Sequence, residues 1–151
     1  GARFLSSLEK LHLSIKKLNL KIIKSEKYYA QAHSIGIPVK GIEYLKDKLF
    51  GLEANLEKLQ AIDFKKGCYI GQENTARMKL KNKLRRKLFP LQTKQNLSLG
   101  DEISYGSSVV GKVLIAKPYP FALIKLYDPE LSSFVNEELD FKNGKVKILL
   151  E

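Results

Sequence analysis

The sole cysteine lies in the segment with the most unusual composition, residues 65–73. Cys68 stands between Gly67 and Gly71, and glycines adopt conformations closed to other residues and let a ligand approach the main chain. Two lysines precede the cysteine and a predicted helix follows it, and both features favour the thiolate. Cys68 is therefore a candidate reactive thiol, with inert packing of a buried free cysteine as the alternative.

Polar residues continue directly after the cysteine segment. Gln72 and Glu73 fall in the first turn of the predicted helix, where acceptors suit the helix dipole and could grip a polar heterocycle. Arg77 follows Glu73 by four residues, the spacing of a helical ion pair, which is more often solvated surface than a site. His12 and His33 are far apart and have no carboxylates at ligand spacing, so we expect no metal site.

The composition limits the class of protein. The chain has 151 residues, a single Met at position 78, and a formal net charge of +11 from 27 Lys and Arg against 16 Asp and Glu. This length suits one domain or two small ones. One cysteine excludes a disulfide scaffold within the chain and an unaided Cys-rich metal site. No apolar run approaches a membrane span, and Gly1 in place of an initiator Met suggests processing or an excerpt.

The positive charge belongs to the first part of the chain. Residues 1–91 carry 20 basic and 8 acidic side chains, whereas residues 92–151 carry 7 and 8. Within the first part, residues 79–87 hold six basic side chains in nine. This run could face phosphates of a nucleic acid or attract the polyglutamate tail of a folate. We favour a third interpretation, a solvated connection with Leu80, Leu84 and Leu88 packing beneath it.

The hydrophobic pattern predicts helices in the first part and strands in the second. We expect a helix over residues 7–20, where a strand fits part of the pattern equally well, then a strand at 20–24. A helix over 26–35 has Ser25 as its N-cap and Gly36 at its end. An irregular helical region over 41–63, with a bend at Gly51, and a helix after Gly71 complete this part.

After residue 83, short runs rich in Val, Ile, Tyr and Phe alternate with turn signals, which indicates an all-β module. The strongest hairpin signal is Asn143-Gly144. Five or six short strands favour closure into a small barrel that hides their edges. The predicted domains are therefore 1–82, α+β, and 83–151, a β-barrel. The strands we place lie at 87–92, 102–105, 109–116, 121–126 and 145–150.

The cysteine segment resembles one known family. Residues 66–73, Lys-Gly-Cys-Tyr-Ile-Gly-Gln-Glu, match the K-G-C-Y-x-G-Q-E signature of the YgfZ family. These are folate-binding proteins related to the T-protein of the glycine cleavage system and implicated in iron–sulfur protein assembly or repair. Residues 32–38 resemble the family's helix ending in G-I-P, and residues 50–56 its F-P-x-E-x-N-L stretch, with Gly51 in place of Pro. The resemblance covers the C-terminal portion of the family and is weakest over residues 6–24 and 128–151.

The resemblance implies a fold and a site. The fold would be α+β, part of the family's central α+β region followed by a small C-terminal antiparallel β-barrel. The cofactor would be tetrahydrofolate, in a pocket that is incomplete in this chain. Cys68 would be the functional residue, acting through a transient disulfide, a one-carbon adduct or a single cluster ligand. Glu53 would face the pterin. The other implied folate-binding residues are Lys66, Gly67, Tyr69, Gly71, Gln72, Glu73 and Arg77.

By this resemblance the protein is an accessory factor in tetrahydrofolate-linked iron–sulfur protein assembly or repair. Its partners would be folate and iron–sulfur client or assembly proteins, without a membrane, in the cytoplasm or alternatively the mitochondrial matrix. One alternative is a folate-dependent aminomethyltransferase, against which Cys68 argues because true aminomethyltransferases lack the cysteine signature. The second alternative is a basic barrel module that binds nucleic acid, in particular tRNA, with tRNA modification as the associated process.

Overall fold

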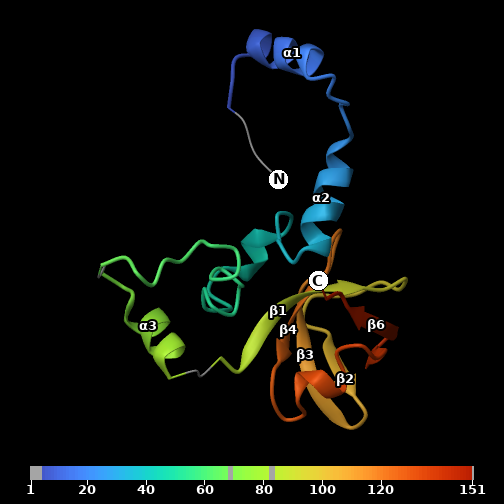
Figure 1. Ribbon diagram of the computed structural model, residues 1–151. Helices are drawn as coiled ribbons and strands as arrows, with labels where there is room; N and C mark the ends of the chain where they lie inside the picture. The colour runs from blue at the N-terminus through green and yellow to red at the C-terminus, as the bar shows by residue number, and fades with distance from the viewer. Residues whose placement is uncertain (1–4, 68–69, 82–83, 151) are drawn as a thin grey trace.

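A computed structural model describes residues 5–67, 70–81 and 84–150 of the chain (Figure 1). Two predicted site residues, Cys68 and Tyr69, lie outside the described residues. The predicted domain boundary between residues 82 and 83 lies outside them as well.

The second part of the chain is a closed β-barrel of six antiparallel strands in the order β1-β4-β3-β2-β5-β6 (Figure 1). With the helices of the first part, the barrel confirms the predicted α+β fold. Closure leaves no long free edge that could pair with another chain. The strands are β1 Arg86–Gln92, β2 Glu102–Tyr105, β3 Ser108–Ile115, β4 Phe121–Lys125, β5 Leu139–Phe141 and β6 Gly144–Ile148.

Alternating side chains fill the interior of the barrel. Leu139 and Phe141 are buried on either side of exposed Asp140, and Val146 and Ile148 on either side of exposed Lys147. This period of two is what a strand with one buried face requires. At position 111 a Cβ would lie 2.4 Å from Cδ1 of buried Ile124 on β4, so any larger residue would force Ile124 to move.

A second apolar cluster covers part of the outer face of the barrel. Leu88, Phe121 and Leu123 are buried there together with Leu45 from the short 3-10 helix η1, Ile42–Leu45. Gly41 permits this approach, since its φ is +83° and a Cβ would meet Cγ2 of Ile115 at 2.7 Å. The segment around η1 is thus packed onto the barrel by apolar contacts.

The described residues also form three α-helices, α1 Leu8–Lys17, α2 Ser25–Ser34 and α3 Glu73–Leu80, and a second short 3-10 helix, η2 Leu131–Ser133. None of the helices in the described part of the chain is long and apolar enough to cross a membrane. Although α1 has an apolar stripe, it has no buried residue and lies away from the barrel (Figure 1).

Helix α2 contacts the loop between β3 and β4. The imidazole Nε2–H of His33 donates to the Pro120 carbonyl at 2.9 Å, and the Tyr119 hydroxyl donates to the Glu26 carbonyl at 3.0 Å. The His33 ring meets the Phe121 ring edge-on at 5.0 Å. Burial lowers the pKa of His33 from its ordinary value, and the bond to Pro120 opposes this in part. His33 is therefore a half-buried side chain that links α2 to the barrel.

Three sequence predictions about local structure are wrong in whole or in part, and one strand was not predicted. Residues 20–24 form no strand, because no described segment pairs with them and a strand needs a partner ladder. Ser25 is the first helical residue, not the cap; the cap is Lys24, whose side chain makes no capping bond. The region 41–63 contains only η1 and consecutive turns. β5 was not predicted, because three residues carry too short an alternation.

Candidate functional site

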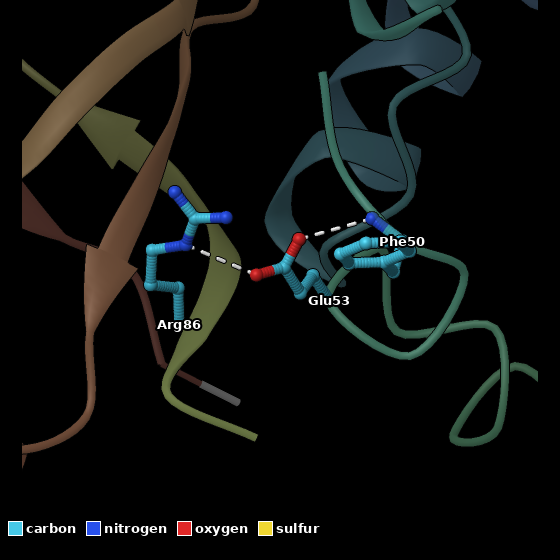
Figure 2. A network of polar contacts seen from close by, with 3 residues as sticks. All are labelled: Phe50, Glu53 and Arg86. Carbon is cyan, nitrogen blue, oxygen red and sulfur yellow. Dashed lines mark hydrogen bonds and ion pairs between the residues drawn. The ribbon is translucent and has the colours of Figure 1, made fainter. Parts of the chain in front are cut away.

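A buried carboxylate joins the turn-rich segment 50–60 to the barrel. Glu53 is only 3% exposed. Its Oε1 accepts a hydrogen bond from Nε of Arg86 on β1 at 3.0 Å, and its Oε2 accepts one from the backbone N–H of Phe50 at 2.9 Å (Figure 2). Charge-assisted bonds of this kind offset the cost of burying a carboxylate.

Backbone bonds reinforce this junction. The N–H of Leu88 donates to the Glu53 carbonyl at 2.8 Å, and the Asn55 side-chain amide donates to the Leu88 carbonyl at 2.8 Å. β6 pairs only with Leu91 and Gln92, so the first half of β1 has a free edge opposite β4. Residues 53–55 occupy that edge and satisfy the backbone N–H and carbonyl of Leu88.

An open pocket of about 780 Å³ lies beside the Glu53–Arg86 pair. We call it the cationic pocket. It brings together the segment 50–53, helix α3, the start of β1 and the end of β4. Four cationic side chains line it against two carboxylates, one of which, Glu53, is already paired. Its lining residues are Phe50, Glu53, Asn74, Arg77, Met78, Arg85, Arg86, Lys125, Tyr127 and Asp128.

The lining of the cationic pocket suits an amphipathic anion. Arg77, Arg85 and Lys125 offer donors for carboxylate or phosphate oxygens. The rings of Phe50 and Tyr127 offer apolar faces on which a planar group could lie. Within the described part of the chain, no three His, Cys, Asp or Glu side chains cluster as metal ligands would.

The structure brings together two of the predicted site residues, Glu53 and Arg77, which line the same pocket. The other predicted site residues that the structure describes do not line it. Of these, Lys66, Gly67, Gly71 and Glu73 are exposed, and Gln72 is the half-buried residue that precedes α3. Cys68 and Tyr69 lie outside the described residues.

Helix α3 is attached through a residue that the sequence did not single out. Lys79 forms an ion pair with Glu57, and its ammonium lies 5.5 Å from the centre of the Phe64 ring. Glu73 and Arg77 do not form the expected ion pair with each other in the described part of the chain. Arg77 is consequently free to face the pocket.

Sequence reasoning missed Arg86, Lys125 and Tyr127 as pocket residues. For Arg86 the signal was the basic run 79–87, which we interpreted as a solvated connection, whereas Lys125 and Tyr127 lie outside that run. Leu88 is fully buried, as that interpretation requires, but Leu80 is 86% exposed. Lys87 is half-buried, and desolvation, then the nearby Lys58, lowers its pKa, while Glu57 raises it.

No protein-family model matches this chain. Part of it is similar to curated iron–sulfur cluster assembly factors. It is 36% identical over 63 residues to the mitochondrial IBA57 homolog of Neurospora crassa, a match that covers 42% of this chain and 14% of that protein. It is 27% identical over 94 residues to the IBA57 homolog of Pyricularia oryzae, covering 62% and 24%. It is 37% identical over 65 residues to mouse IBA57, covering 43% and 18%. The matches thus span less than a quarter of each of these relatives.

Proposed function

We propose that this chain forms part of a tetrahydrofolate-linked factor for the assembly or repair of iron–sulfur proteins, acting as an accessory factor rather than by turnover. Its similarity to three mitochondrial iron–sulfur cluster assembly factors carries the proposal. The cationic pocket supports it, since its lining suits a ligand with a planar ring at one end and carboxylates at the other.

The residues of the cationic pocket fit a folate. Tetrahydrofolate joins a pterin ring through an aromatic linker to a glutamate with two carboxylates. Arg77, Arg85 and Lys125 would bind the carboxylates, and Tyr127 would pack against the linker. Both oxygens of Glu53 already accept a bond, so we assign Glu53 to holding Arg86 in place. Its contact with the pterin stays a prediction.

The Cys68 segment is proposed as the second element of the function. Lys66, Gly67, Tyr69, Gly71, Gln72 and Glu73 would shape the surroundings of the thiol. An activated thiol reacts as the thiolate at a lower pH than an ordinary cysteine. Alkylation of Cys68 measured across pH tests this directly. A rate no faster than that of a model thiol would remove Cys68 from the proposal.

The proposed partners are iron–sulfur client or assembly proteins. The three relatives carry the word mitochondrial in their names, which supports the matrix over the cytoplasm as the proposed compartment. None of these names refers to tRNA, so the tRNA alternative gains no support from them.

A chimera tests the proposed function. This chain would replace the aligned stretch of the mouse relative, and the chimera would be expressed in mouse cells that lack that relative. We expect it to restore the activity of iron–sulfur enzymes, and we expect the Cys68→Ser chimera to fail. Lys94→Gln, an exposed change in the barrel away from the cationic pocket, is the matched control. A folded, abundant chimera that restores nothing would contradict the proposal.

A further inference from the structure

The outer face of the barrel carries a second hollow next to the cationic pocket, with which it shares Arg86 and Lys125 on its lining. This outer groove, of about 590 Å³, crosses the strands in the order β1, β4, β3, β2. Its rim carries Lys48, Arg86, Lys112 and Lys125, against the single carboxylate of Glu102.

The positions of two rim cations follow from the sheet register. Arg86 and Lys125 are directly opposite each other on β1 and β4. Like charges in this position repel and destabilise the pair of strands. Glu53 neutralises Arg86. No carboxylate among the described residues forms an ion pair with Lys125, Lys48 or Lys112, although Glu102 lies opposite Lys112 in the register of β2 with β3. The rim therefore holds an excess of positive charge that an anionic partner would relieve.

The floor of the outer groove is aliphatic. Leu114 and Leu123 lie at its base, where the apolar cluster beneath η1 ends. Leu99 is 51% exposed and Val109 38% exposed at its margins. Exposed apolar side chains surrounded by polar residues mark surfaces that bind other molecules.

We propose that the outer groove binds an acidic, extended peptide segment of a partner protein, with carboxylates on the rim lysines and apolar side chains on the floor. Single-stranded nucleic acid is the poorer match, because its binding relies on aromatic rings that stack on bases and none lines this groove. Three strand spacings of about 4.8 Å give a path of roughly 14 Å, or about four extended residues. The proposal rests on this geometry and needs neither folate nor a cluster.

The test uses the full chain and a fluorescein-labelled peptide of alternating Glu and Leu, about nine residues long so that it overlaps the path at both ends. Fluorescence anisotropy should show saturable binding that weakens with added salt. The Lys48→Gln, Lys112→Gln double variant should bind the peptide at least about fivefold more weakly. The matched double variant Lys94→Gln, Lys142→Gln changes two exposed lysines elsewhere and should bind like the parent. Urea unfolding confirms that both variants are folded.

Three results would overturn the proposal. The first is an equal loss of affinity in both double variants, which would indicate attraction to net charge alone. The second is a single-stranded oligonucleotide or an oligo-γ-glutamate of equal charge that displaces the peptide at lower concentration. The third is no binding at all. Lys48 and Lys112 do not line the cationic pocket, so these outcomes leave the proposed folate site untouched.

Discussion

The barrel and the region before it differ in two properties, the number of buried apolar side chains and the net charge. Of twenty buried apolar side chains in the described residues, all but Ala32, Leu45 and Leu52 lie between positions 88 and 148. The net positive charge has the opposite distribution, since the excess of basic over acidic residues lies wholly before residue 92. The barrel thus supplies a core, and the first region supplies charge that depends on the barrel for its position.

This difference shows why the cationic pocket lies where it does. Arginines of the first region need an anchor that the region itself cannot provide. The buried Glu53–Arg86 pair and the backbone bonds of Leu88 provide it, by attaching the segment 50–60 to β1. The predictions below test this contrast, beginning with the largest expected effect.

Truncation in the barrel core should have the largest effect on stability. Phe134 is fully buried in the interior cluster. Phe134→Ala removes its packing and leaves a cavity, at a cost of about 3–5 kcal/mol in the free energy of unfolding. Urea unfolding followed by circular dichroism measures this loss. A change below about 1 kcal/mol would show that the barrel is not the stability core.

Loss of the Glu53 charge should loosen the junction without unfolding the barrel. Glu53→Gln weakens the bond to Arg86, and we expect a loss of about 1–3 kcal/mol. The specific readout is hydrogen exchange at the Leu88 amide, which bonds to the Glu53 carbonyl.

Glu57→Gln is the matched control for this change, because its pair with Lys79 is exposed. It should cost less than about 0.5 kcal/mol and leave the Leu88 amide protected. Equal exchange at Leu88 in both variants would contradict the role of Glu53.

We expect His33 to have a smaller effect on the stability of the fold, and we expect this effect to depend on pH. Its pKa is lowered by burial, so the unfolded chain takes up a proton at a higher pH than the folded chain does. Stability is therefore complete above about pH 6.5 and falls as the pH drops below it. Urea midpoints at about pH 7.5 and about pH 5.5 measure this difference. His33→Gln should reduce it, and an unchanged difference would assign it to other groups.

The smallest effect is expected in α1, which has no buried residue. Leu11→Ala should change the free energy of unfolding by less than about 0.5 kcal/mol. The same urea measurement applies. A loss comparable to that of Phe134→Ala would show that α1 is packed in solution.

Much of the barrel could be predicted from the sequence because its strands alternate and its turns carry strong signals. The pattern predicts four strands to within about a residue or two, and β6 by its Asn143-Gly144 hairpin. Three residues at 139–141 were too few to reveal β5. Residues 20–24 have the composition of a strand, but no described strand pairs with them. Composition alone does not reveal whether a pairing strand is present.

The candidate site was less predictable, because it depends on contacts between distant residues. Glu53 and Arg77 were identified through a family resemblance, and the structure places them on one pocket. Arg86 and Lys125 were not identified, since their meeting depends on the register of β1 with β4. The contact between Glu53 and Arg86 likewise joins residues 33 positions apart.

The central claim is that the cationic pocket at this junction binds a folate. Titration of the chain with folinic acid, an air-stable tetrahydrofolate, followed by saturation-transfer NMR, tests it most directly. Because the pocket is open, we expect weak binding, with a Kd above about 100 µM. In the Arg77→Gln, Arg85→Gln double variant the affinity should fall at least fivefold. The Lys94→Gln, Lys142→Gln variant should bind as the parent does. Undetectable binding, or binding that survives the loss of both arginines, would contradict the claim.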